Sequence, residues 1–230
     1  MNIIKSIPSV LTSMNLLSGF IAIVLNDPFW SPVFIMAGGL FDLMDGAVAR
    51  KLNASSAFGA ELDSLADLIS FGAAPAFLYF NHVLTNSDKI TAAISVSFLV
   101  VFAAIRLAKF NISSDQKYHF IGLPSPAAGL FFTFLILESH TKSFLNFNNN
   151  TAIWIALPII FGLLMVSPIK FFALKKSDNK YFKIMSVLNI AVFLICSAIW
   201  LITGFPAIPA ALILYILFSI IFYNFLDTQS

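Results

Sequence analysis

Hydrophobic and polar positions alternate along the chain on the scale of membrane-spanning helices. Apolar runs of about 20 residues, the length that a helix needs to cross a bilayer, are separated by polar breaks such as NDP at 26–28 and RKLNAS at 50–55. Eight such segments can be drawn, near residues 8–26, 31–51, 60–81, 90–110, 124–140, 151–169, 183–203 and 206–226. The pattern predicts an all-α, polytopic membrane helix bundle of about eight transmembrane helices.

Composition supports an integral membrane protein. The chain is 59% hydrophobic and 10% charged, whereas a soluble domain has about 25% charged residues. The first apolar run continues to Leu25 without an A-x-A-like site, which argues against a cleaved signal peptide. No linker divides the chain, so residues 1–230 are expected to form a single membrane domain. The last two segments are joined by the short turn TGFP at 203–206, and a re-entrant hairpin is the alternative there.

The positions of Lys and Arg predict the orientation. With the N-terminus in the cytoplasm, the eight-segment arrangement leaves only Lys89 and Lys142 on the outer side. The other 11 of the 13 basic residues fall on the cytoplasmic side: Lys5, Arg50, Lys51, Arg106, Lys109, Lys117, Lys170, Lys175, Lys176, Lys180 and Lys183. An excess of Lys and Arg marks cytoplasmic loops. Both termini are therefore expected in the cytoplasm.

Acidic residues are concentrated in one stretch, residues 42–67. Five of the 11 acidic residues of the chain lie there, four of them aspartates: Asp42, Asp45, Asp63 and Asp67. At 1.5 Å per helical residue, the first two lie roughly 13 and 9 Å from Lys51, and the other two lie in the first turns of the next segment. Both pairs are thus expected in the cytoplasmic half of the membrane, where carboxylates are costly and usually functional.

The spacing of the aspartates indicates a metal site. The first pair is spaced i, i+3 and the second i, i+4, so each pair shares a helical face. Arg50 and Lys51 supply two positive charges for four negative ones, and protonation of one or two aspartates is the alternative. Oxygen ligands at this density suit hard divalent ions such as Mg²⁺ or Mn²⁺. Arg50 is a natural bidentate partner for a phosphate beside them. The small residues Gly46, Ala49 and Gly59 either make room for a ligand or allow close helix packing.

The whole stretch resembles the signature of the CDP-alcohol phosphatidyltransferase family. The pattern D-x2-D-G-x2-A-R-x8-G-x3-D-x3-D runs from Asp42 to Asp67 without a departure and fixes eight positions. The resemblance implies a membrane enzyme that moves a phosphatidyl group from CDP-diacylglycerol to an alcohol and releases CMP. It also implies a homodimer in the cell membrane, with the active site facing the cytoplasm and no nucleic-acid partner.

The resemblance implies a role for each signature residue. The four aspartates would bind two Mg²⁺ or Mn²⁺ ions, and Asp67 would also serve as the general base. The CDP-lipid site would comprise five positions, Gly46, Ala49, Arg50, Ser56 and Gly59. Of these, Ala49 and Gly59 match the small-residue positions of the family, and Ser56 is equally well explained as a loop serine.

Further stretches are similar to bacterial and archaeal phosphatidylserine synthases, a branch of this family. The resemblance is clear to about residue 128, weakens afterwards and returns at 165–172, so the catalytic core is expected at about 7–170, with additional helices at 183–226. One departure is Ser9, where the family usually has Asn. The stretches are IPSVLTSMNLLSGF at 7–20, SFGAAPAF at 70–77, RLAKFN at 106–111, FIGLPSPAA at 120–128 and MVSPIKFF at 165–172.

L-Serine as the acceptor would need a cation for its carboxylate. Arg106, Lys109 and Asn111 end the fourth segment on the cytoplasmic side, and Ser125 lies in the proline-containing loop that follows. We expect these four residues to help form a serine pocket, the alternative for Arg106 and Lys109 being an anchor to lipid phosphates. Thr12 and Asn15, at the start of the first segment, are expected either to contact the nucleotide or to cap and pack the helix.

Other functions are less consistent with the sequence. The same chemistry with glycerol phosphate or inositol as acceptor is the main alternative. A membrane prenyltransferase would carry its two acidic motifs in separate halves of the chain. An ion transporter would spread charges along a path through the bilayer, and the last four segments are expected to offer no intramembrane carboxylate.

Overall fold

The structure is a computed structural model that describes residues 3–112, 119–140, 151–172 and 207–227. Seven of the eight predicted segments fall in these ranges, and each is helical; the segment at 183–203 lies outside them. The described helices are α1 (Ile3–Leu25), α2 (Trp30–Lys51), α3 (Ala57–Asp67), the π-helix η1 (Leu68–Ala73), α4 (Ala74–His82), α5 (Lys89–Ile112), α6 (Ser125–His140), α7 (Thr151–Val166) and α9 (Ala207–Asp227).

Three of these helices are long and apolar enough to cross a membrane: Ser6–Leu25, Trp30–Lys51 and Lys89–Ile112. Three shorter apolar helices accompany them, at Ser125–Glu138, Thr151–Val166 and Ile208–Ser219. The predicted helical fold class is therefore confirmed, and the three long apolar helices are consistent with a membrane protein. The number of spans remains a prediction.

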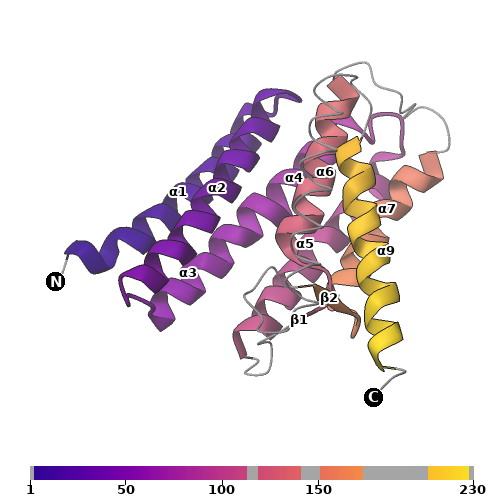
Figure 1. The fold of residues 1–230 in the computed structure, drawn as a ribbon. Coiled ribbons are helices and arrows are strands. Elements are labelled where there is room, and N and C mark those ends of the chain that lie inside the picture. The colour runs from indigo at the N-terminus through magenta and orange to yellow at the C-terminus, as the bar shows by residue number, and fades with distance from the viewer. Residues whose placement is uncertain (1–2, 113–118, 141–150, 173–206, 228–230) are drawn as a thin grey trace.

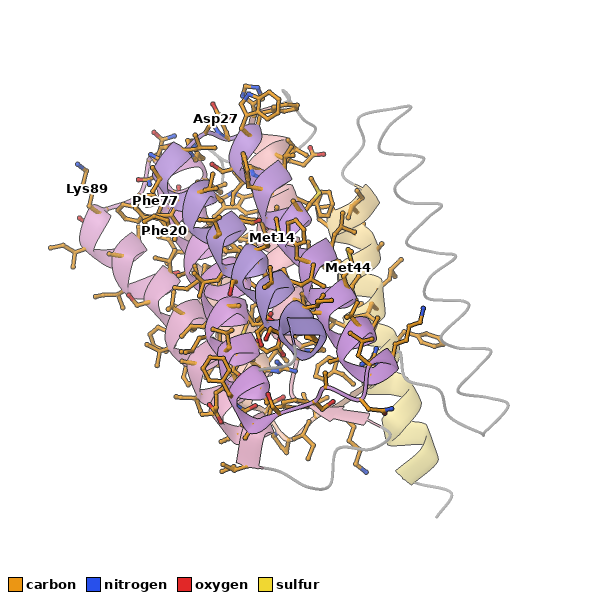
Figure 2. The ribbon with its side chains drawn as sticks, turned by 90° about the vertical axis from the view of Figure 1, so that its left-hand side faces the viewer. Met14, Phe20, Asp27, Met44, Phe77 and Lys89 are labelled. Atoms are coloured by element: carbon orange, nitrogen blue, oxygen red, sulfur yellow. The ribbon has the colours of Figure 1, made fainter. Side chains whose placement is uncertain are left out.

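The helices form a bundle with two distinguishable ends (Figure 1). The start of α1, the turn between α2 and α3, and the end of α9 lie at the lower end in this view. Figure 2 shows Asp27, in the α1–α2 turn, and Lys89, at the start of α5, at the opposite end. The turn between α2 and α3 joins the two halves of the acidic stretch, so this stretch lies toward the lower end of the bundle, which we call the site-bearing end.

A tight turn makes α1 and α2 an antiparallel hairpin. Asn26 adopts a positive φ of 46°, which asparagine tolerates better than most residues. Asp27 Oδ1 accepts hydrogen bonds from the backbone N–H groups of Phe29 and Trp30, at 2.9 and 2.7 Å. These bonds hold the pKa of Asp27 below its usual value. Since they also satisfy donors at the start of α2, the helix begins at a defined residue.

The third predicted segment is one continuous helix. Its middle turn is the π-helix η1, which we call the π-turn. α3, η1 and α4 follow each other without a break from Ala57 to His82. The π-turn is fixed from two sides: Ser70 Oγ donates to the backbone oxygen of Asn15 at 2.8 Å, and Gly129 of α6 packs directly against Phe71. A Cβ on Gly129 would lie 2.6 Å from the Phe71 carbonyl oxygen, so only glycine allows this approach. π-turns often occur at functional sites, and this one directly follows Asp67.

A small sheet at the site-bearing end was not predicted from the sequence. Strand β1 (His119–Ile121) pairs antiparallel with β2 (Lys170–Phe172), Ile121 lying opposite Lys170. Gly122 follows β1 with a φ of +79°, and its N–H donates to Ile169 O at 2.8 Å. The sheet therefore ties the loop before α6 to the segment after α7. Two three-residue strands are too short for an alternating pattern to reveal them.

Aromatic side chains fill the interior between α4, α6 and α7. The rings of Phe131 and Phe161 stack with centroids 4.4 Å apart, and Tyr79 meets Phe132 edge-on at 4.9 Å. The Tyr79 hydroxyl donates to Trp154 O at 3.1 Å, which satisfies its polar atom inside the core. This packing holds the π-turn, and with it the end of α3, in place.

Large apolar side chains cover the outer faces of α1 and α2, as expected of helices that contact lipid. Figure 2 shows Met14, Phe20 and Met44 along this exposed surface. One prediction about the later segments is wrong: Glu138 of α6 is a carboxylate only 1% exposed. It stands near the end of the segment, next to a polar break, where the sequence pattern suggests an exposed position.

Candidate active site

Carboxylates from two helices meet at the site-bearing end of the bundle. Oxygens of Asp42, on α2, and of Asp63 and Asp67, on α3, all lie within 4.8 Å of one another. The predicted convergence of the two pairs is thus observed for three of the four aspartates. A turn of five residues, 52–56, connects the two helices and makes this possible.

Asp45 differs from the other three carboxylates. It lies outside that group of three, is buried, and its Oδ2 is 2.5 Å from Thr12 Oγ1 on α1. Asp67 is also buried, and its Oδ1 accepts a hydrogen bond from Asn15 Nδ2 at 3.3 Å. Each Asp pair therefore has one buried carboxylate that is hydrogen-bonded to a side chain of α1.

The predicted CDP-lipid residues lie on both sides of the turn between α2 and α3. The Ser56 side chain caps α3 by accepting from Gly59 N at 3.0 Å, and its hydroxyl hydrogen remains available to a ligand. A Cβ on Gly46 would lie 3.3 Å from Arg50 Nη1, so the exposed guanidinium folds back over the glycine. Ala49, partly buried, accepts a hydrogen bond from Ala54 N at 2.9 Å through its carbonyl oxygen. All five positions thus adjoin the carboxylates along the chain.

The chemistry of these ligands fits a divalent ion. Three carboxylates within 4.8 Å repel each other unless a cation or protons lie between them. Within the described residues, Asp63 Oδ1 is buried and has no hydrogen-bond partner. A buried oxygen left without a donor is costly, and coordination of Mg²⁺ or Mn²⁺ would satisfy it.

The predicted serine residues are only partly brought together. Arg106 is buried, and its Nη1 donates to Ser125 Oγ at 3.1 Å. Arg106 also acts electrostatically on Asp67. Lys109 is exposed and shares with Arg106 the lining of a cavity of about 320 Å³, whereas Asn111 does not line it and accepts from Ser64 Oγ at 3.1 Å.

The rest of the cavity lining was only partly predicted from the sequence. It comprises Ile121, the last residue of β1, and residues 165–168 at the end of α7 and just beyond it. Ile121 lies in the stretch FIGLPSPAA, which the sequence placed near a serine pocket, whereas the weak resemblance at MVSPIKFF was the signal for residues 165–168. The fold explains the gap, because the β1–β2 pairing brings together segments more than 40 residues apart.

Helical structure and three helices of membrane-spanning length are typical of a membrane protein, and its cluster of carboxylates could hold a metal ion. The sequence model of the CDP-alcohol phosphatidyltransferase family matches residues 5–161. The chain belongs to this family and is therefore a transferase.

Proteins named CDP-diacylglycerol–serine O-phosphatidyltransferase are similar to this chain over most of its length. The Helicobacter pylori protein of that name is 33% identical over 226 residues, covering 95% of this chain and 91% of the relative. The Methanocaldococcus jannaschii protein is 36% identical, covering 96% and 95%. The Bacillus subtilis protein is 35% identical over 180 residues, covering 74% and 92%.

Proposed function

We propose that the protein transfers the phosphatidyl group of CDP-diacylglycerol to the hydroxyl of L-serine, giving phosphatidylserine and CMP. The observation that carries this proposal is the similarity, along 95% of the chain, to relatives named for that reaction. The cluster of Asp42, Asp63 and Asp67 and the buried Arg106, which acts electrostatically on Asp67, supply suitable chemistry.

The carboxylates would hold two divalent ions. Asp42, Asp63 and Asp67, together with Asp45, are the proposed ligands for Mg²⁺ or Mn²⁺, which would neutralise charge on the diphosphate when bound. Arg50 would bind a phosphate oxygen, and Ser56 would donate a hydrogen bond. Gly46, Ala49 and Gly59 would leave space for the nucleotide because they carry little or no side chain.

Asp67 is proposed as the general base. The serine hydroxyl transfers its proton to the Asp67 carboxylate while its oxygen bonds to the lipid-bearing phosphorus. The phosphorus–oxygen bond to CMP breaks in the same step, and the electron pair leaves with CMP. The Arg106 charge and the Asn15 amide lie close to this carboxylate, and the buried location limits access of water as a competing acceptor.

Arg106, which lines the cavity, and Ser125, bonded to it, are proposed to bind the serine carboxylate. Arg106 is buried but faces the cavity that Lys109 also lines, and its planar fork matches a carboxylate. The cavity volume of about 320 Å³ is in the range of small-molecule sites. Asn111, bonded to Ser64, would act by steadying α5 against α3.

Release of CMP tests the proposal. The purified protein in detergent micelles is given CDP-diacylglycerol, Mn²⁺ and one alcohol at a time: L-serine, glycerol 3-phosphate or inositol. We expect CMP release that depends on L-serine. Release only with glycerol phosphate or inositol would assign the other acceptor, and no release with any alcohol would refute phosphatidyl transfer.

We further propose that the site faces the cytoplasm of a multi-pass membrane protein that forms a homodimer. The basic residues Arg50, Lys51, Lys109 and Lys170 belong to segments at the site-bearing end, whereas Lys89 lies at the other. In a Cys196→Ser background, a cysteine at position 51 should react with an impermeant maleimide only in inside-out vesicles. A cysteine at position 89 should react only in right-side-out vesicles. Chemical cross-linking in the membrane tests the homodimer, which should give a band at twice the monomer mass.

A further inference from the structure

Two buried polar side chains of α1 contact signature aspartates, and neither of the two belongs to the signature that runs from residue 42 to 67. Thr12 and Asn15 are three residues apart and so share one face of the helix. Thr12 contacts Asp45, and Asn15 contacts Asp67. Each therefore reaches the buried member of a different Asp pair.

We propose that Thr12 and Asn15 are positioning residues, which fix one carboxylate of each Asp pair in the orientation that binds divalent ions. The proposal rests on the metal-dependent site of the proposed function. A donor on one oxygen of a carboxylate stops its rotation and directs the other oxygen. Partners of metal ligands commonly act in this way, and their loss typically costs 10- to 100-fold in metal affinity or activity.

The contacts of Thr12 favour donation to Asp45. Its hydroxyl lies 2.5 Å from Asp45 Oδ2 and 3.0 Å from the backbone oxygen of Pro8. One hydroxyl carries one hydrogen, and the shorter contact is to a carboxylate, which accepts more strongly than a carbonyl when ionised. The contact with Pro8 is the usual bond of a threonine hydroxyl to the backbone of its own helix. A variant without the hydroxyl loses both contacts.

Asn15 is held in place by its surroundings. It is 0% exposed, its backbone oxygen accepts from Ser70 Oγ, and a Cβ on Gly38 of α2 would come within 2.9 Å of its Oδ1. The amide oxygen therefore occupies the space that Gly38 leaves open. Its nitrogen must face Asp67, because two oxygens would repel each other when that carboxylate is ionised.

The buried amide oxygen of Asn15 indicates that the amide nitrogen is the functional group at this position. Within the described residues Oδ1 has no hydrogen-bond partner, and burying a polar atom without a partner is destabilising. Leucine, of similar shape, would avoid that cost. The feature that offsets it is the amide N–H donated to Asp67, so the position is explained by the site rather than by packing.

Direct measurement of Mn²⁺ binding tests the inference without relying on activity. Free Mn²⁺ is followed by electron paramagnetic resonance during titration of purified wild-type protein and of Thr12→Val, Asn15→Leu and Gly38→Ala. The Gly38→Ala variant leaves the amide intact but forces it to move, and the moving atom belongs to the end of a side chain. We expect the Mn²⁺ affinity of all three variants to fall about 10- to 100-fold.

Matched controls separate positioning from general damage. Thr12→Ser retains the hydroxyl and should restore most of the affinity. Gly39→Ala adds the same methyl group one residue later, where a Cβ meets only the Phe71 ring at 3.5 Å, and should bind Mn²⁺ like the wild type. Ser13→Ala removes an exposed hydroxyl that donates to Ser9 O, and it should likewise bind Mn²⁺ like the wild type. Should Asn15→Leu fail to fold, the Gly38→Ala and Gly39→Ala pair still decides the matter.

The outcomes distinguish this inference from the proposed function. Unchanged Mn²⁺ affinity in folded Thr12→Val and Gly38→Ala, with a wild type that binds Mn²⁺, would overturn the positioning roles alone. A wild type that releases CMP with serine but binds no Mn²⁺ would overturn both the metal site and the inference. Weaker binding in the three variants, with recovery in Thr12→Ser, would support it.

Discussion

Replacing Arg106 by lysine separates charge from geometry in the proposed serine pocket. Arg106 is buried, 7% exposed, and donates from Nη1 to Ser125 Oγ at 3.1 Å. Lysine keeps the positive charge that attracts Asp67 but cannot offer a planar fork to a carboxylate. The change should therefore weaken the binding of serine more than it affects the chemical step.

The size of the effect follows from the bond that is lost. A hydrogen bond involving a charged group contributes about 1.5–3 kcal/mol, and every 1.4 kcal/mol is tenfold. Arg106→Lys should thus raise the KM for serine about 10- to 150-fold, with a KM for CDP-diacylglycerol changed less than about twofold. Ser125→Ala, which leaves Arg106 in place but removes the hydrogen bond between them, should raise the serine KM by a smaller factor.

Steady-state kinetics of CMP release, with each substrate varied in turn, provides the measurement. Ser97→Ala is the control on the same helix, because Ser97 is exposed and its hydroxyl bonds only to Ala93 O at 2.7 Å. An unchanged serine KM in folded Arg106→Lys would refute the assignment of Arg106 to the serine pocket. A selective rise in the KM for CDP-diacylglycerol would instead place Arg106 at the nucleotide lipid.

Three further results are expected. Asp67→Asn should fold and retain at most about 1% of the wild-type turnover, since general bases contribute roughly 10²–10⁴-fold. The control Glu61→Gln, which changes an exposed acid on the same helix, should remain active. Near-normal CMP release from Asp67→Asn would exclude Asp67 as the base. Chelation by EDTA should abolish CMP release and added Mg²⁺ or Mn²⁺ should restore it, whereas activity that survives exhaustive chelation would rule out a metal requirement. Gly129→Ala should lower the stability by about 1–3 kcal/mol, because its Cβ would meet the Phe71 backbone at 2.6 Å, and a thermal unfolding midpoint equal to that of the wild type would contradict the described packing.

The metal site could be predicted because its residues are close in the chain. Asp42 and Asp63 are joined by one short turn, so helical periodicity and the length of the turn nearly determine their distance. The partners of the site could not be found in this way. Thr12 and Asn15 are visible as polar residues on an apolar helix, but periodicity gives only the face that they share, and the carboxylates they contact depend on how α1 packs against α2 and α3.

The cavity beside Arg106 shows a second limit. Its lining comes from α5, from the last residue of β1 and from the end of α7 and the residues just after it. Only the tertiary structure brings these segments together. Asn111 shows why: its position at a polar helix end predicted a ligand contact, and the structure shows that its side chain accepts a hydrogen bond from Ser64. Polar residues at the end of a membrane helix have several possible partners, and the sequence does not rank them.

The π-turn at Leu68–Ala73 has a consequence for exchanging parts between members of this family. A π-turn contains one residue more than the α-helical register requires, and each residue of an α-helix corresponds to about 100° of rotation. The side chains of α3 and α4 are therefore out of phase along what is otherwise one helix: α3 directs Asp63 and Asp67 to the carboxylate cluster, while α4 directs Tyr79 to the aromatic core. A chimera joined before residue 68 or after residue 73 keeps both orientations, whereas a junction that drops a single residue between them would turn one functional face away from its partners.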